Sequence, residues 1–288
     1  ISTMEKRLLK PAEITDFTID MAKDKVAGSF QKLLILGILA GAFIAFAAEG
    51  SNMAAFNLFA EPTTYGLGKA LAGVVFGTGL MLVVLAGGEL FTGNTLILAA
   101  VCEKQVSMGK MLRNWIIVYL GNFIGSLLVA YMMVHSGLLA SGADMLGAIT
   151  LKIAVYKVNL GFSQAFFLGI MCNWLVCLAV WISFGADTMA GKILAIFFPI
   201  WLFIASGFEH SVANMYYIPA GILAKTNPAY VDAAVSLGVS PEKINALGWG
   251  SFLSNNLLPV TLGNIVGGAI FVGLIYWIAY LRKEKQGI

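Results

Sequence analysis

The sequence is poor in charged residues. Only 11% of its 288 residues are Asp, Glu, Lys or Arg, whereas a soluble domain of this size has about a quarter. Hydrophobic residues make up 59% of the chain. Because such a chain cannot cover a water-facing surface, a soluble fold is excluded and an integral membrane protein is indicated. The formal net charge of +3 is too small to suggest a nucleic-acid partner.

Cysteine and histidine are also scarce, with three and two residues. Cys172 and Cys177 are separated so that they fall on different faces of a helix. We therefore expect buried thiols, with neither a disulfide nor a metal site. The sequence groups no His, Cys and carboxylate residues beyond Glu209-His210, so we expect no cofactor and no enzymatic activity.

The sequence contains six long apolar stretches. A membrane-spanning helix needs about 20 residues. The apolar stretches are 33–48, 69–101, 115–135, 162–184, 191–224 and 258–281. The stretches 69–101 and 191–224 are too long for one helix and are polar at their centres, so we predict that each is one crossing made of two half-helices. Two separate spans are the alternative, but neither stretch has a charged loop in which to turn.

The distribution of basic residues predicts the orientation. Six crossings leave both termini on one side, which holds 13 Lys and Arg residues against 5 on the other. Both termini are therefore expected in the cytoplasm. We predict an amphipathic surface segment at 1–32, a six-helix transmembrane domain at 33–281 and a cytoplasmic tail at 282–288. Within the first segment, residues 11–31 are expected to form a helix with an apolar side made of Ile14, Phe17, Met21 and Phe30.

Three short motifs recur in the same order in the two halves. The pairs are LGI at 36–38 and 168–170, GGELFTGNT at 87–95 with GFEHSVANM at 207–215, and GNFIG at 121–125 with GNIVG at 263–267. Three spans in each half place the second half in the membrane with the opposite orientation. An inverted 3+3 repeat with paired broken helices is typical of transport proteins, and the breaks mark the permeation path.

The polar residues of the repeat suit a helix break inside a membrane, where water does not satisfy the backbone. Glycines permit the turn. The residues expected to support the breaks are Glu89 and Asn94 in the first and Glu209 and Asn214 in the second. Glu89 and Glu209 occur in both halves, which favours a role in tying the loops, with a proton relay as the alternative.

His210 lies in the centre of a broken membrane helix, where an ionisable residue favours a functional role. The other histidine, His135, ends the third span and is expected at the surface. The spacing of Phe76, Leu80 and Phe203 fits an apolar constriction on each side of His210, or plain packing. Asn173 and Asn264 fit either helix-tying hydrogen bonds or a polar network around His210. Lys157 precedes the fourth span, where it either attracts anions or is solvated.

Several of these residues belong to motifs that resemble those of a known family. The motifs ELFTGNT, LGIMCNWLVCLAVW (168–181), ASGFEHSVANMYYIPAGI (205–222) and NNLLPVTLGNIVGG (256–268) resemble the formate/nitrite transporter family, which includes hydrosulfide channels. The resemblance covers essentially the whole chain. It implies an aquaporin-like six-helix bundle in the bacterial inner membrane, assembled as a homopentamer with one pore per subunit.

The resemblance also implies roles for individual residues. The expected pore centre is His210, Thr92 and Asn173; the cytoplasmic constriction is Leu80, Leu90 and Phe91; the external constriction is Phe76 and Phe203. Lys157 corresponds to a vestibule lysine. The first broken loop corresponds to a cytoplasmic gate, and we expect the N-terminal helix around Lys25 to move with it.

Family members pass formate, nitrite or hydrosulfide. Gly93-Asn94 after Thr92 favours the hydrosulfide branch, so we expect a hydrosulfide channel, with formate and nitrite as related substrates. A proton-coupled formate or nitrite symporter using the same pore is the alternative. A membrane enzyme lacks the residues for catalysis, and a neutral-solute pore fits the single histidine and Lys157 less well.

Overall fold

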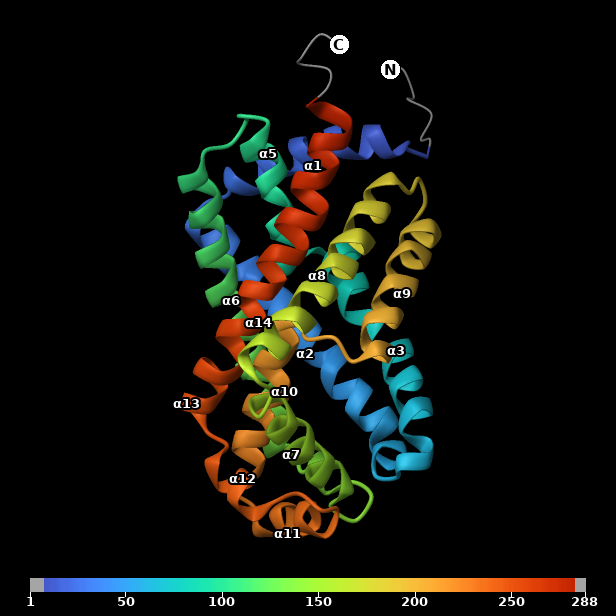
Figure 1. Ribbon diagram of the computed structural model, residues 1–288, viewed down its shortest axis with the longest axis vertical. Helices are drawn as coiled ribbons and strands as arrows, with labels where there is room; N and C mark the ends of the chain where they lie inside the picture. Colours follow the sequence, from blue (N-terminus) through green and yellow to red (C-terminus); the bar gives the residue numbers. More distant parts are fainter. Residues whose placement is uncertain (1–7, 283–288) are drawn as a thin grey trace.

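The computed structural model describes residues 8–282, and this part of the chain is helical without any strand (Figure 1). The first half contains α1 (Pro11–Val26), α2 (Phe30–Phe59), η1 (Pro62–Thr64), α3 (Tyr65–Met81), η2 (Leu82–Gly87), α4 (Phe91–Asn94), η3 (Thr95–Ile97), α5 (Leu98–Cys102), α6 (Met108–His135) and η4 (Leu138–Ala140). The second contains α7 (Met145–Val158), α8 (Phe162–Gly185), α9 (Met189–Ser206), α10 (Ser211–Ala224), α11 (Pro228–Ser236), α12 (Pro241–Ala246), α13 (Trp249–Ser251), η5 (Phe252–Leu257), α14 (Leu258–Ile265), η6 (Val266–Leu274) and η7 (Trp277–Leu281).

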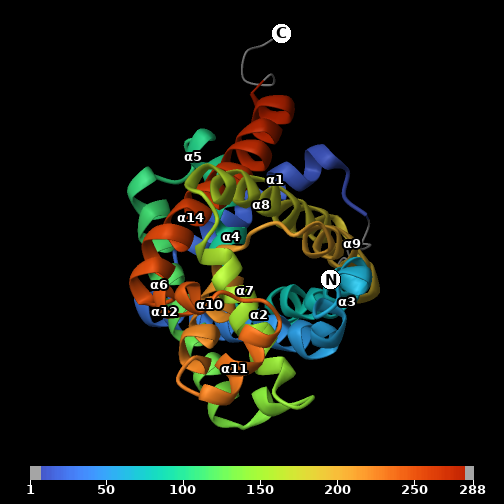
Figure 2. The same cartoon turned by 60° about the horizontal axis from the view of Figure 1, so that its bottom comes forward.

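Six helical segments within residues 8–282 are long and apolar enough to cross a membrane. They are Phe30–Phe59, Pro62–Gly87, Met108–His135, Phe162–Gly185, Met189–Ser206 and Trp249–Leu281. The predicted all-α fold with six spans is confirmed. Helices α1 and α5 lie at one end of the long axis, with α11 and α12 at the other (Figure 1). In Figure 2, α3 and α9 lie together on one side of the molecule and α6 and α14 on the other.

Three spans extend several residues beyond the apolar stretches predicted, and one of them is α6, which begins at Met108 instead of 115. Helix α2 continues past residue 48 to Phe59, because Ser51 is satisfied inside the bundle. Its hydroxyl donates to the carbonyls of Ala47 (2.7 Å) and Ala72 (3.0 Å). The last span begins at Trp249 instead of 258. Polar residues therefore did not mark the ends of these helices.

The N-terminal helix is shorter than predicted, and only part of its predicted apolar side is buried. Helix α1 ends at Val26, and Phe30 already begins α2, where it is exposed. Phe17 is also exposed. The buried residues of α1 are Ile14, Thr15, Thr18, Ile19 and Ala22. These residues are buried because α1 packs against α8 and α5. Residues 1–7 of the predicted segment and 283–288 of the predicted tail lie outside the described residues.

Helix α7 was not predicted, because its 14 residues are too few for a span. It is nevertheless largely buried and packs against α10. The connection at 225–257 contains α11, α12 and the start of the last span. The second half thus begins with a short packed helix, as the first half begins with α1.

The long stretches 69–101 and 191–224 both contain an interruption of helical structure. The first follows a π-helical turn, η2, and falls between Gly87 and Phe91. The second falls between Ser206 and Ser211. Gly87 (φ 113°) and Gly207 (φ 86°) turn the chain with a left-handed backbone that glycine adopts readily. The non-helical backbone is short in both interruptions and comprises residues 88–90 in the first and 207–210 in the second.

Glycines bring the backbones of two helix pairs into contact. A Cβ atom on Gly125 of α6 would overlap the Ile38 carbonyl of α2. In the same way, a Cβ atom on Gly263 of α14 would overlap the Phe166 carbonyl of α8. Small residues allow such close approach in membrane helices. The helix pairs α2–α6 and α8–α14 each lie beside one interruption. Asn122 of α6 and Asn264 of α14 form hydrogen bonds to the two interruptions.

Candidate functional site

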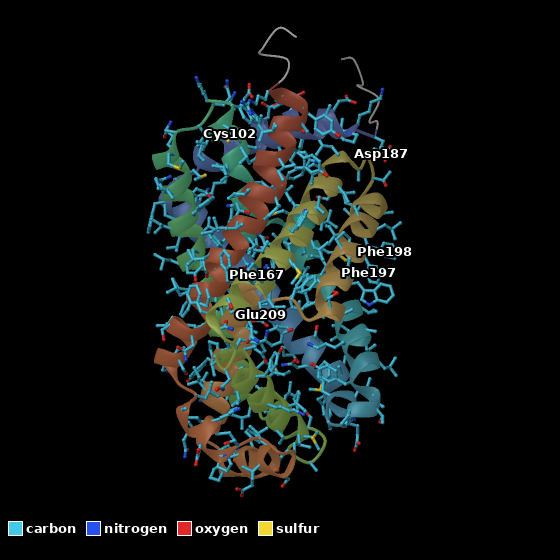
Figure 3. All side chains as sticks on the ribbon, in the orientation of Figure 1. Cys102, Phe167, Asp187, Phe197, Phe198 and Glu209 are labelled. Atoms are coloured by element: carbon cyan, nitrogen blue, oxygen red, sulfur yellow. The ribbon has the colours of Figure 1, made fainter. Side chains whose placement is uncertain are left out.

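Each interruption is hydrogen-bonded to a neighbouring long helix at a glutamate. The Glu89 N–H donates to the Leu36 carbonyl of α2 (3.0 Å), and the Glu209 N–H donates to the Leu168 carbonyl of α8 (3.3 Å). Leu36 and Leu168 begin the two copies of the LGI motif. Figure 3 shows Glu209 near the middle of the long axis, whereas Cys102 and Asp187 lie toward one end.

An asparagine fixes each loop through its side-chain amide. Asn122 donates to the carbonyls of Gly37 (2.7 Å) and Glu89 (2.9 Å) and accepts from the Phe91 N–H (2.9 Å). Asn264 donates to the carbonyls of Gly169 (2.8 Å) and Glu209 (3.0 Å) and accepts from the Ser211 N–H (2.8 Å). Of the two roles left open for Asn264, the structure favours helix tying, because its side chain binds only backbone groups.

The first carboxylate is paired with a lysine and an asparagine. Glu89 accepts from Lys25 of α1 (2.7 Å) and from Asn94 (2.9 Å). Asn94 also donates to Asn114 of α6 (2.9 Å), which in turn donates to the Lys25 carbonyl (3.1 Å). The N-terminal helix is therefore bonded directly to the first loop.

The second carboxylate has the same kinds of partner. Glu209 accepts from Lys157 of α7 (2.7 Å) and from Asn214 (2.6 Å). Asn214 donates to Asn256 (2.8 Å), which donates to the Lys157 carbonyl (3.0 Å). Lys157 is consequently neither solvated nor an unpaired charge, and its side chain is only 12% exposed. In both loops the glutamate tie expected from the repeat is present.

His210 and Thr92 connect the two interruptions. The Nε2 atom of His210 lies 2.9 Å from Thr92 Oγ1, and both residues are buried. His210 Nδ1 accepts the Ala213 N–H (3.0 Å) and so caps α10. A neutral imidazole carries one proton, and Nδ1 is occupied as an acceptor, so the proton is at Nε2 and is donated to Thr92. The Thr92 hydroxyl keeps its own proton for another acceptor.

Asn173 forms a hydrogen bond to the backbone of Thr92 and none to His210. Its amide donates to the Thr92 carbonyl (3.1 Å), Thr95 Oγ1 (3.1 Å) and the Asn264 carbonyl (2.6 Å). The same Thr92 carbonyl accepts from Thr95 (2.7 Å) and from the Cys177 thiol (3.2 Å). Sequence reasoning left Cys177 as an inert buried thiol and missed this contact. The spacing of Asn173 and Cys177, one helical turn apart, was the available signal.

Of the three phenylalanines expected in the constrictions, Phe76 and Phe203 lie near His210, whereas Phe91 packs against α6. Phe203 stacks on the His210 ring at 6.0 Å, and Phe76 packs edge-on against Phe203 at 5.5 Å. Phe91 contacts Trp115 (6.0 Å) and Tyr119 (5.0 Å) of α6. Phe91 was expected in the cytoplasmic constriction and Phe76 in the external one, but neither residue lines the cavities described below, and Phe91 packs against α6. As the first residue of α4, it is directed by the helix toward α6.

Two cavities approach the His210–Thr92 pair. The α1-side cavity, of about 270 Å³, is lined by Lys25, Glu89, Leu80, Leu90 and Gly93 among others. The α7-side cavity, of about 420 Å³, is lined by Lys157, Glu209, Phe203 and His210 among others. Gly93 of the α1-side cavity directly follows Thr92, and His210 lines the α7-side cavity, so the hydrogen bond lies between the two cavities. His135 lies outside both and is exposed, as expected. No cluster of His, Cys, Asp and Glu suited to a metal occurs within 8–282.

A six-span helical protein with two cavities separated by a buried polar pair has the architecture of a membrane channel or transporter. Residues 12–278 match the family model described as "Formate/nitrite transporter", and the chain belongs to this family. The family expected from the sequence is confirmed. It is a family of multi-pass membrane transporters and channels.

Named relatives give a narrower comparison. The chain is 39% identical to a "Probable formate transporter" of Methanothermobacter thermautotrophicus, over 95% of this chain and 97% of that protein. It is 37% identical to "Formate channel FocA" of Escherichia coli (strain K12), with 97% of each chain covered. A solved structure titled "Pentameric formate channel with formate bound" is similar with a TM-score of 0.77 and 37% identity, covering 88% of this chain and 98% of that chain. These names support formate, and none supports hydrosulfide.

Proposed function

We propose that the protein is a channel for formate and similarly small monovalent anions. Formate replaces hydrosulfide as the favoured substrate, because the relatives described above are named for formate. The observation that carries the proposal is the His210–Thr92 hydrogen bond between the two cavities. It places a polar pair between Leu90, which lines the α1-side cavity, and Phe203, which lines the α7-side cavity.

The hydrogen bonds favour a donor role for this pair. Thr92 Oγ1 accepts a hydrogen bond from the His210 Nε2–H, so its own hydroxyl proton is available to donate to an anion oxygen. A second proton on His210 would have to displace the Ala213 N–H from Nδ1. This cost favours passive conduction over the proton-coupled symporter, in which His210 is the proton carrier. A bare anion otherwise faces a large desolvation cost in an apolar passage.

The two halves are proposed to be an inverted 3+3 repeat with two broken membrane helices. The support is that five residues of each half make matching hydrogen bonds. The first set is Lys25, Glu89, Asn94, Asn114 and Asn122, and the second is Lys157, Glu209, Asn214, Asn256 and Asn264. The basic-residue distribution then favours cytoplasmic termini, with the α1-side cavity facing the cytoplasm.

Assembly is proposed to be a homopentamer with one pore in each subunit, by analogy with the pentameric formate channel. Many large apolar side chains of the spans are exposed on the single chain, which suits contact with lipid and with other subunits. The first loop is proposed to be the gate, with Lys25 holding it closed through Glu89.

Proteoliposomes containing the purified protein test the function. We expect formate to enter faster than in empty vesicles, nitrite and hydrosulfide to enter at lower rates, and glycerol not to enter. Reversal potentials measured across a proton gradient separate the two mechanisms: a passive channel follows the formate gradient alone. Glycerol flux equal to formate flux would contradict an anion channel.

A further inference from the structure

We propose that Lys69 and Asn52 form an anion-binding subsite in the α7-side cavity, which receives the anion before it reaches His210. The proposal rests on the proposed anion function, and it assigns the receiving charge to Lys69 instead of Lys157. The ligand class is a small monovalent anion with oxygen acceptors, such as formate. Both residues line the cavity that contains His210.

Lys157 does not offer a net charge to an incoming anion. Its ammonium lies 2.7 Å from Glu209 Oε1, and the carboxylate is 2% exposed. The same ammonium lies 5.0 Å from the Tyr217 ring centroid. A positive charge with a carboxylate at this distance is largely neutralised as seen from the cavity. The anion therefore needs another cation in this cavity.

Lys69 has an ammonium without such a carboxylate. Within residues 8–282 the ion pairs are Lys25–Glu89 and Lys157–Glu209, and Lys69 takes part in neither. Its Nζ lies over the rings of Phe59 (5.7 Å) and Tyr65 (5.6 Å), which hold the side chain in place. It also lies 4.0 Å from the position a Cβ atom on Gly207 would occupy, beside the second interruption. The charge is thus fixed next to the loop that carries His210.

Asn52 provides an independent observation on the same cavity. Its side chain is only 3% exposed, yet its Nδ2 has no hydrogen-bond partner among the described residues. Buried amide donors without an acceptor are rare in folded proteins and require an explanation. An anion in the cavity supplies the missing acceptor. An ammonium and an amide N–H both donate, so the pair suits an anion and disfavours a cation.

The cavity also contains Lys152, a second cation of α7. Fixed positive charge at the mouth of a narrow path raises the local anion concentration. The subsite should therefore act mainly at low formate concentration, where it determines how often the anion reaches His210. At saturating formate, passage beyond Phe203 limits the rate and the subsite matters less.

The test compares Lys69→Met, which keeps the length of the stem, with Lys69→Arg, which keeps the charge. Asn52→Leu tests the amide separately, and Lys243→Met is the matched control, since Lys243 is exposed on α12 outside the cavity. Formate binding is measured by saturation-transfer NMR on the protein in nanodiscs. Formate flux is measured in proteoliposomes over a range of concentrations, and pentamer assembly is checked by gel filtration.

We expect Lys69→Met to weaken formate binding and raise the half-saturating concentration about tenfold, the loss of one charge-assisted contact. The maximal rate should change less than twofold. Asn52→Leu should weaken binding about threefold, whereas Lys69→Arg and Lys243→Met should match the wild type. If Lys69→Met does not assemble, Asn52→Leu still tests the subsite, because unchanged formate binding in that variant would overturn it.

The outcomes separate the subsite from the channel function. Wild-type flux with unchanged binding in Lys69→Met and Asn52→Leu would overturn the subsite and leave the channel in place. Lys69-dependent binding without any wild-type flux would support the subsite and overturn the channel. A wild-type protein that neither binds nor conducts formate would overturn both.

Discussion

Asn122 and Asn264 make the same three hydrogen bonds at the two helix interruptions. Each donates to a carbonyl of a long helix and to the carbonyl of a loop glutamate, and each accepts the first helical N–H after the loop. Non-helical backbone is stable in a membrane only if its polar groups are satisfied by protein. These two side chains therefore keep the loops in place around His210 and Thr92.

Replacing either asparagine by leucine should destabilise the protein. Asn122→Leu and Asn264→Leu keep the volume but leave the carbonyl of the loop glutamate and the first helical N–H without a partner, at about 1–3 kcal/mol for each buried group, whereas the carbonyl of the long helix keeps its helical hydrogen bond. We expect both variants to lower the midpoint of thermal unfolding in detergent by a similar amount. Asn245→Leu, at an exposed position of α12, is the control. Loss of stability in only one variant would contradict equivalent roles for the two asparagines.

The Lys157–Glu209 pair should behave as a buried ion pair. Lys157→Met leaves the Glu209 carboxylate, which is 2% exposed, without its cation, and we expect a loss of about 3–5 kcal/mol. Adding Glu209→Gln should recover much of this loss, because no buried charge remains. Thermal unfolding of the single and double variants measures the coupling. Strictly additive effects would argue against a direct interaction.

The Lys25–Glu89 ion pair, which corresponds to Lys157–Glu209, should control the first loop. Lys25 is more exposed than Lys157, so Lys25→Met should affect global stability less. It should instead loosen the loop, because Glu89 loses its bond to α1. Hydrogen exchange of a peptide covering 88–95 should be faster than in the wild type, while a peptide covering 207–214 is unchanged. Equal rates in both proteins at 88–95 would remove the gating role of Lys25.

The sequence predicted the six spans because apolar length alone specifies a membrane helix. It did not predict α7, since Met145–Val158 is too short to be recognised by length and is buried only through contact with α10. It also stopped α2 too early at 48, because the satisfied hydroxyl of Ser51 depends on α3, which is remote in sequence. Polar residues inside a membrane protein end a helix only where they lack partners.

The position of His210 within a broken membrane helix marked it as a candidate functional residue, and the family resemblance paired it with Thr92. The structure joins these two residues by a hydrogen bond. The direction of Phe91 was not predictable, since it depends on where α4 begins relative to α6. Cys177 was missed for a related reason: its thiol matters only because the Thr92 carbonyl lies 3.2 Å away. Side-chain partners across the bundle require the fold.

The last prediction concerns protonation of His210. His210→Asn keeps a hydrogen-bonding side chain beside Thr92 but does not exchange a proton with the anion. In the donor mechanism proposed above, wild-type formate flux follows the concentration of the formate anion from pH 5 to pH 8, and His210→Asn lowers the rate without changing the shape of that profile. If His210 instead carries protons, wild-type flux rises as the pH falls, and the variant loses this rise. Flux measured at fixed total formate in both proteins distinguishes the two, with gel filtration to confirm the assembly of the variant. A rise at low pH that survives in His210→Asn would assign the titrating group elsewhere, to the Glu209 carboxylate or to formate itself.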